Sequence, residues 1–197
     1  MSAEIFITLV VFAFVTSITP GPNNFMLLAS GVNFGFKRTV PHMFGIGGGF
    51  LVLLIAVGLG LGELLARFPP LFLALKFAGG IYLLYLAYKI AMSRSMGQEA
   101  SSGTPMSFIA AAAFQWVNPK AWVMAVTAMA TYTDKSSFIA SVVLVAGVFV
   151  LVNVPSVSAW AGFGSFMRDW LSHPVRLKWF NILMGVLLAI SLWPMLR

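Results

Sequence analysis

The sequence alternates between long apolar stretches and short polar segments. Six stretches contain very few charged residues, and they span residues 4–33, 41–66, 71–92, 107–132, 137–167 and 176–195. Each is long enough for a helix that crosses a hydrocarbon core of about 30 Å. None shows the period-two alternation of a barrel strand, so helices are the spanning elements that this pattern permits. The pattern therefore predicts an all-α integral membrane protein with six transmembrane helices.

The composition excludes several classes of protein. Hydrophobic residues make up 60% of the chain and charged residues only 9%, whereas about 25% of a soluble domain is charged. Lipid must therefore cover most of the surface, and the lipid bilayer is an expected partner. The net charge of +7 would suggest nucleic acid in a soluble protein. Because basic loops orient a membrane protein, we expect no nucleic-acid partner here.

Residues that usually carry catalysis or bind metals are scarce. Cysteine is absent, which excludes disulfides and thiol chemistry, and only two histidines are present, His42 and His173. The acidic residues lie at or near the ends of the apolar stretches: Glu4, Glu63, Glu99, Asp134 and Asp169. No paired carboxylates, catalytic triad or set of metal ligands falls at one membrane depth. We therefore expect no enzyme, no catalytic residue, no metal site and no cofactor.

The basic residues predict the orientation of the chain. The loops that follow the first, third and fifth stretches carry Lys37, Arg38, Lys89, Arg94, Arg168, Arg176 and Lys178. The opposite side carries Arg67, Lys76, Lys135 and Arg197. Since cytoplasmic loops are enriched in lysine and arginine, we expect the larger set to face the cytoplasm and both termini to face the periplasm.

The two halves of the chain share one layout. Residues 94–104 form a polar linker between halves at about 1–93 and 105–197, within a single transporter domain over residues 1–197. The first stretch of each half is interrupted by proline and asparagine, and Pro20 and Pro119 lie 99 residues apart. With three helices per half, the repeat must be inverted in the membrane. Interrupted helices at corresponding positions point to the binding site of a transporter.

The first interruption consists of Thr19, Pro20, Gly21, Pro22, Asn23 and Asn24. Pro20 disfavours helical geometry at the residue before it, and Pro22 suits the first position of a new helix. Free N–H groups at the new start favour an anion, and carbonyls released before it favour a cation. Together they suit the two ends of a zwitterion, so these residues are predicted to bind substrate. The alternative is a proline kink without a binding role.

The second interruption is Asn118, Pro119 and Lys120, preceded by Gln115. Asparagine caps helices and proline favours their first position, so a helix is predicted to begin here within the membrane. A lysine in such a place costs several kcal/mol unless it meets water, a partner or an anion. We expect Lys120 to bind a substrate carboxylate. The alternatives are a lysine that extends to the membrane surface and one that braces the released carbonyls.

Two further features remain open from the sequence alone. Asn153 lies two residues before Pro155 in the fifth stretch, so the polar kink either lines the binding cavity or packs within the bundle. Gly45 and Gly49 have the spacing that lets two helices approach closely. Packing is the favoured interpretation for this pair, with a flexible hinge as the alternative.

Three stretches of this sequence occur together in one known family. They are Thr19 to Asn23, Gly80 to Lys89, and Phe114 to Lys120. In content and spacing they resemble the lysine-exporter/homoserine-resistance family of bacterial amino-acid exporters, and the likeness covers essentially the whole chain. The resemblance implies export of amino acids, driven by protons. The doubled asparagine after Pro22 and the stretch before Pro119 resemble the branch that exports cysteine, O-acetylserine and other small neutral amino acids.

The predicted function is secondary active export of small neutral amino acids across the bacterial inner membrane. The two halves would alternate access to a site at the membrane midplane, with protons as the coupling ion and an amino acid as the small-molecule partner. A homodimer is left open as the assembly. The rival interpretation is a non-transporting scaffold or assembly factor that uses the Pro/Asn motifs as kinks. A channel ranks lower, because no ring of charge is evident.

Overall fold

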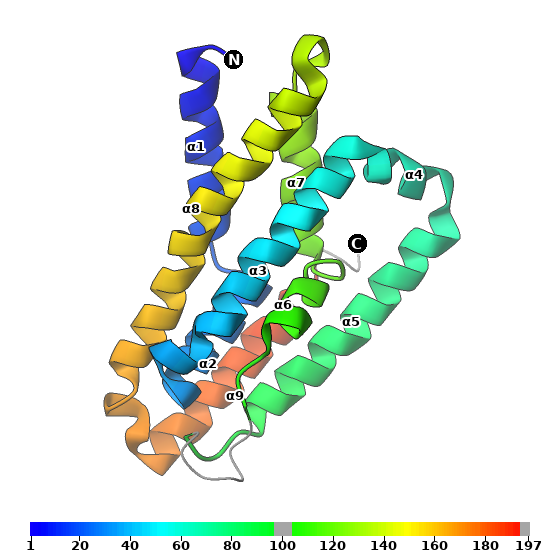
Figure 1. Cartoon of the computed structure of the whole chain (residues 1–197). Helices are drawn as coiled ribbons and strands as arrows, with labels where there is room; N and C mark the ends of the chain where they lie inside the picture. The colour runs from blue at the N-terminus through cyan, green and yellow to red at the C-terminus, as the bar shows by residue number, and fades with distance from the viewer. Residues whose placement is uncertain (97–103, 194–197) are drawn as a thin grey trace.

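The computed structural model describes residues 1–96 and 104–193, and over these ranges it contains helices and no strand (Figure 1). The α-helices are α1 (Ala3–Ile18), α2 (Pro22–Phe34), α3 (Phe36–Ala56), α4 (Gly62–Arg67), α5 (Pro69–Ala91), α6 (Phe108–Phe114), α7 (Pro119–Tyr132), α8 (Phe138–Met167) and α9 (Pro174–Ile190). A π-helical segment, Val57–Leu61, joins α3 to α4. The prediction of an all-α protein is confirmed. Most of the predicted polar linker, residues 97–103, lies outside the described residues.

Several helices are long and apolar enough to cross a membrane. Within the described residues these are Phe36–Leu65, Leu73–Ala91 and Phe138–Met167. Helices α1 and α2 pass the same test together, as a pair bent by 55° at the break between them. Length and composition therefore support three or four spanning segments, and a total of six stays a prediction.

Two long helices, α3 and α8, run side by side and organise the bundle (Figure 1). Helices α1 and α2 both pack against α8, whereas α6 and α7 both contact α3. Helix α9 packs against α5. A core of buried aromatic and aliphatic side chains joins α1, α3, α7 and α8, with Phe50 and Phe149 in edge-to-face contact at its centre. The two breaks in the chain, between α1 and α2 and between α6 and α7, are thus held against the same two long helices.

Glycines allow the closest of these contacts. A Cβ atom added to Gly31 of α2 would lie 2.2 Å from the carbonyl oxygen of Ala161 in α8. One added to Gly164 of α8 would lie 2.2 Å from the oxygen of Leu28 in α2. Because each glycine faces the backbone of the other helix, any larger residue at either position would push α2 and α8 apart.

The predicted packing role of the second glycine pair is confirmed. Added Cβ atoms at Gly45 and Gly49 would lie 2.4 Å from the oxygen of Phe108 and the Cα of Ala112, respectively. Helix α6 therefore lies directly on the backbone of α3.

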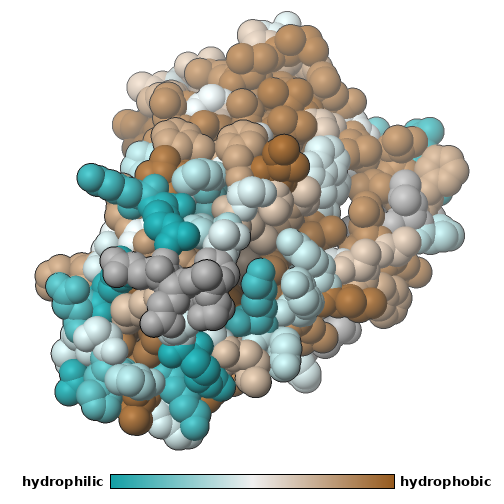
Figure 2. Space-filling view, turned by 60° about the horizontal axis from the view of Figure 1, so that its bottom comes forward, coloured by the Kyte–Doolittle hydropathy of each residue, from teal (hydrophilic) through white to brown (hydrophobic). Residues whose placement is uncertain are grey.

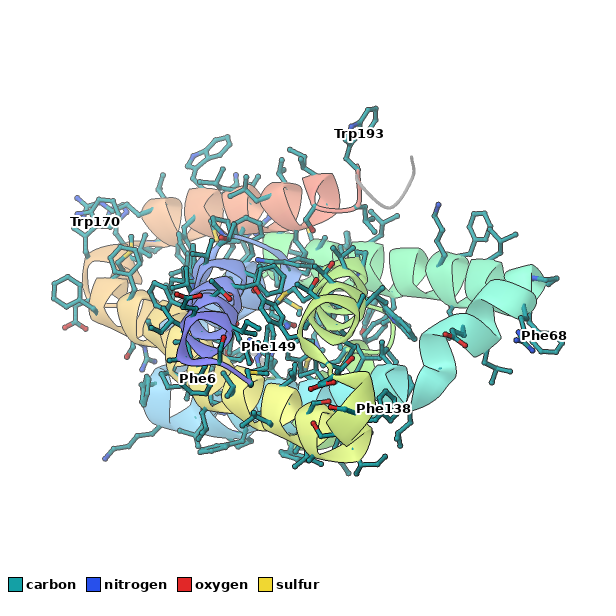
Figure 3. All side chains as sticks on the ribbon, turned by 90° about the horizontal axis from the view of Figure 1, so that it is seen from above. Phe6, Phe68, Phe138, Phe149, Trp170 and Trp193 are labelled. Carbon is teal, nitrogen blue, oxygen red and sulfur yellow. The ribbon has the colours of Figure 1, made fainter. Side chains whose placement is uncertain are left out.

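The surface separates into a polar end and apolar sides. The α2–α3 and α8–α9 connections and the end of α5 with residues 92–96 meet at the bottom of Figure 1, and hydrophilic residues gather at this end in Figure 2. These connections and the adjoining helix ends carry the seven basic residues predicted to be cytoplasmic. Seen from above, Phe68, Trp170 and Trp193 lie at the periphery, whereas Phe149 lies inside the bundle (Figure 3). We call the polar end of the bundle the basic end. The side of the membrane that it faces stays a prediction.

Candidate functional site

The break between α1 and α2 leaves helix-end carbonyls that accept side-chain hydrogen bonds. Helix α1 ends at Ile18, and α2 begins at Pro22. The Asn24 side chain turns back from α2, and its Nδ2 donates to the oxygens of Ser17 (2.9 Å) and Thr19 (2.8 Å). The amide of Asn24 thus ties the start of α2 to the end of α1.

A tryptophan from α8 fixes the same helix end. Trp160 Nε1 donates to the oxygen of Ile18 at 3.0 Å. Side chains from two other helices therefore satisfy carbonyls that a broken helix would otherwise leave unpaired in an apolar setting.

The second break brings Lys120 to the first. Asn118 is the N-cap of α7, and its Oδ1 accepts from the backbone N–H of Lys120 at 3.2 Å. The Lys120 ammonium reaches across to the first break, where Nζ donates to the oxygens of Thr19 (2.5 Å) and Pro20 (3.4 Å). This is the bracing geometry that the sequence left open as an alternative. A role in binding a carboxylate stays a prediction.

A reciprocal amide pair connects α2 to the end of α6. Asn23 Nδ2 donates to Gln115 Oε1 at 2.8 Å, and Gln115 Nε2 donates back to Asn23 Oδ1 at 3.2 Å. Gln115 also donates to the oxygen of Ala111 and is fully buried. We call this the cavity pair, because both residues line the cavity described below.

Two amide oxygens near these residues have no partner. Asn153 of α8 donates from Nδ2 to Ser17 Oγ at 3.0 Å, while its Oδ1 is buried and unpaired. The Oδ1 of Asn24 is likewise buried and unpaired. An unsatisfied buried acceptor costs about 1–3 kcal/mol, so a donor that reached either oxygen would be stabilised there.

These groups surround one small cavity between the two breaks, α3 and α8. Its walls are formed by Thr16, Ser17, Gly21, Asn23, Asn24, Phe50, Gln115, Asn118, Lys120, Ala121, Met124, Asn153 and Val157. It has room for only about one or two water molecules. Most of the polar wall consists of amides and hydroxyls, and Lys120 contributes the one charged side chain among these lining residues.

The structure brings together most of the residues that the sequence singled out. Seven of them line the cavity: Gly21, Asn23, Asn24, Gln115, Asn118, Lys120 and Asn153. Thr19 and Pro20 take part through their carbonyl oxygens, which contact Lys120. Pro22 and Pro119 begin helices and do not line the cavity.

Sequence reasoning missed the hydroxyls of the last turn of α1. Thr16 and Ser17 line the cavity, and Ser17 accepts the hydrogen bond that orients Asn153. The available signal was their polarity in the turn before Pro20. Phe50, Met124 and Val157 gave no signal, because apolar residues in apolar helices do not distinguish a cavity wall from core.

The sequence profile of the LysE type translocator family matches residues 14–191, a range that includes both breaks. The chain belongs to this family. Two relatives that carry the name cysteine/O-acetylserine efflux protein, from Escherichia coli (strain K12) and Shigella flexneri, are each 32% identical to this chain over 185 residues. Each alignment covers 90% of this chain and 90% of the relative. No solved structure matches the chain. A translocator moves its substrate without altering it, so this protein is a transporter and not an enzyme.

This LysE type translocator has a second reciprocal amide pair, far from the cavity. Asn33 of α2 donates to Asn181 of α9 at 2.9 Å, and Asn181 donates back at 3.2 Å. Ser93 joins the pair, since its Oγ donates to Asn33 Oδ1 and its carbonyl accepts from Asn181 Nδ2. We call Asn33 and Asn181 the end pair, because they lie where α2 and α5 end, near the basic end.

One buried ionisable side chain of the translocator stands apart from both pairs. His42 of α3 is 2% exposed, and neither of its ring nitrogens has a hydrogen-bond partner. It does not line the cavity.

Proposed function

We propose that this translocator is a secondary active exporter of small neutral amino acids or their close derivatives across the bacterial inner membrane. The observation that carries the proposal is the pair of unsatisfied amide oxygens, Asn24 Oδ1 and Asn153 Oδ1, in a cavity between two broken helices. The names of the cysteine/O-acetylserine efflux relatives support the same class of substrate. Export is coupled to protons and proceeds by alternating access.

The substrate ammonium is expected to bind the two free amide oxygens. Asn24 and Asn153 come from different helices, and each uses its amide nitrogen for a fixed contact with the end of α1. Their oxygens are therefore held in place before a ligand arrives. A hydrogen bond from a charged donor contributes about 1.5–3 kcal/mol, which is enough to orient a small zwitterion.

The substrate carboxylate is expected to bind the start of α2. Helix α7 is capped by the side chain of Asn118, whereas the N-cap of α2 is Gly21, which offers no side-chain acceptor. The first-turn N–H groups of α2 therefore remain for an anion, which the partial positive charge of the helix end favours.

The chemistry of the walls favours a substrate that is neutral and small. No carboxylate occurs among the residues that line the cavity, so a second ammonium, as in lysine, would lack a counter-charge. Phe50, Met124 and Val157 form the apolar part of the wall and restrict side-chain size. Cysteine, serine and O-acetylserine meet both conditions.

Transport requires the cavity to enlarge, because it now holds about one or two water molecules. We propose that six spanning segments form two inverted halves, residues 1–93 and 105–197, which open the site to each side in turn. Both chain termini then lie in the periplasm and the basic end in the cytoplasm.

Counterflow in proteoliposomes tests the proposal. Vesicles that contain the purified protein and unlabelled L-cysteine, kept reduced, should accumulate labelled L-cysteine from outside. Asn153→Leu removes one ammonium acceptor and is expected to raise the half-saturation concentration about 10- to 100-fold. Ser158→Ala is the matched control on α8, because the Ser158 hydroxyl bonds to its own helix and does not line the cavity.

The result also separates a transporter from a scaffold. Wild-type protein that shows no counterflow of L-cysteine, O-acetyl-L-serine or L-serine would contradict the proposal and favour the non-transporting alternative. Asn118→Leu provides a second discrimination, since it removes the cap of α7 at the cavity. It should abolish counterflow in a transporter, whereas a scaffold would keep its assembly.

A further inference from the structure

The Lys120 ammonium occupies a position that a free cation would otherwise favour. The carbonyl end of a helix carries a partial negative charge, and α1 ends at Ile18, directly before Thr19 and Pro20. Nζ of Lys120 lies 2.5 Å from the oxygen of Thr19 and 3.4 Å from that of Pro20. A side chain of α7 therefore supplies a tethered cation to the end of α1.

Nothing else at the cavity can gain or lose a proton. The lining residues contributed by α1, α2, α3 and α8 are Thr16, Ser17, Gly21, Asn23, Asn24, Phe50, Asn153 and Val157. Those beside Lys120 at the second break are Gln115, Asn118, Ala121 and Met124. None of these side chains titrates in the physiological range, so carbonyl and amide dipoles alone balance the charge of Lys120.

Gly21 makes room for this contact. A Cβ atom at position 21 would lie 2.7 Å from Cδ of Lys120 and 3.2 Å from its Nζ. The backbone of Gly21 is fully extended, with φ of 179°, a conformation that any residue adopts. A larger residue at position 21 would therefore displace the end of the Lys120 side chain.

The carbonyl of Thr19 links Lys120 to the proposed substrate site. It accepts hydrogen bonds from Lys120 Nζ and also from Asn24 Nδ2, at 2.8 Å. The Oδ1 of the same Asn24 amide is one of the two free acceptors for a substrate ammonium. A change at the lysine is thus transmitted to the substrate through one shared oxygen.

On the basis of the proposed function, we propose that Lys120 carries the proton that is exchanged for the substrate. In its ammonium form Lys120 ties α7 to the end of α1, and in its amine form it releases this tie. The step is an ionisation in which the ammonium becomes an amine and one proton passes to water in the cavity. The amine takes up a proton again when the cavity opens to the other side, so one proton moves inward for each substrate exported.

Proton movement driven by substrate tests this assignment. Proteoliposomes that hold a pH-sensitive dye receive an outside pulse of L-cysteine, and the lumenal pH change is divided by the amount of labelled L-cysteine transported. Wild-type protein should move about one proton per substrate, the stoichiometry expected for one titrating site. Lys120→Met should move at least about 10-fold fewer protons per substrate, whatever transport rate it retains. Lys76→Met, in α5 and away from the cavity, is the matched control and should equal wild type.

If Lys120→Met shows no transport, a binding measurement tests whether Lys120 carries the exchanged proton. Binding of L-cysteine to wild-type protein in weakly buffered detergent should release about one proton, and Gly21→Ala should reduce this release by displacing the lysine. His42→Asn should leave it unchanged, because His42 does not line the cavity.

These measurements distinguish failure of the assignment to Lys120 from failure of the proposed function. A Lys120→Met protein that still moves one proton per substrate overturns the assignment and leaves the proposed function intact. Wild-type transport with no proton movement overturns the assignment together with proton coupling, but not export itself. Loss of proton release in His42→Asn alone transfers the role to His42 and also overturns the assignment. Absence of wild-type counterflow instead contradicts the proposed function itself.

Discussion

The cavity pair and the end pair use the same chemistry in two different ways. Both are reciprocal bonds between amide side chains, and in both pairs α2 supplies one partner. In the end pair, Asn33 and Asn181 are almost fully buried, and the hydroxyl and carbonyl of Ser93 complete the set. In the cavity pair, Asn23 is only half-buried and its neighbour Asn24 keeps a free acceptor.

The difference lies in what each pair leaves unpaired. The end pair closes on itself, so it joins α2, α5 and α9 without offering anything to a ligand. The cavity pair stands beside Asn24 and Asn153, which also line the cavity and whose amide oxygens are buried and unpaired. Buried polar groups that are satisfied by the protein stabilise a structure, whereas those left open are maintained for a partner. Substitutions at the two pairs should therefore separate stability from transport.

Among substitutions at the two pairs and at the helix contact between them, breaking the cavity pair should have the largest effect on transport. Gln115→Leu removes both bonds to Asn23 and releases the second break from α2. Loss of two hydrogen bonds and exposure of an unpaired amide correspond to about 3 kcal/mol, or a drop of about 100-fold in counterflow. Ala113→Leu is the control, since it places a leucine at an exposed position two residues earlier. Near-normal counterflow in Gln115→Leu would contradict a role for the cavity pair.

The contact between α2 and α8 lies between the two pairs, and breaking it should have the next-largest effect. Gly164→Ala places a Cβ atom against the oxygen of Leu28, so α2 must shift away from α8. Overpacking of this kind costs about 1–3 kcal/mol, and we expect lower thermal stability together with weaker substrate binding. Gly147→Ala, in the same helix with open space around it, should be neutral or slightly stabilising. Equal melting temperatures for the two variants would argue against tight packing at Gly164.

Breaking the end pair should give the smallest effect, and it should fall on stability alone. Asn181→Leu leaves Asn33 with its bonds to Ala29 and Ser93. Single hydrogen bonds in membrane proteins contribute about 0.6 kcal/mol on average and about 1.7 at most, so a loss of about 1–2 kcal/mol is expected. Size-exclusion after heating in detergent would detect it. A change of more than about twofold in half-saturation would mean that the end pair also governs transport.

The sequence predicted the helical architecture because a long, uniformly apolar stretch crosses lipid as a helix. It also indicated most of the residues that line the cavity, because proline and glycine in such stretches determine the local backbone geometry. Helix α2 begins at Pro22 and α7 at Pro119. The inverted repeat, six crossings and the orientation of the termini stay predictions, since they depend on how the halves sit in a bilayer.

The contacts between distant parts of the chain could not be predicted. For Lys120 the favoured prediction was binding of a carboxylate, and bracing of released carbonyls was the alternative. The sequence could not show that these carbonyls would be those of Thr19 and Pro20, 101 and 100 residues earlier in the chain. Asn33 and Asn181 lie 148 residues apart, and neither stands at a break that would have drawn attention to it. Their pairing depends on the packing of α2 against α9, which hydropathy alone does not determine.

The small size of the cavity has an electrical consequence for the cell. About one or two water molecules between two helix breaks do not form a continuous file along which ions or protons could leak. Many idle copies of this protein could therefore accumulate in a bilayer without discharging its voltage. Synthesis of the protein ahead of demand would then carry little energetic penalty for the membrane.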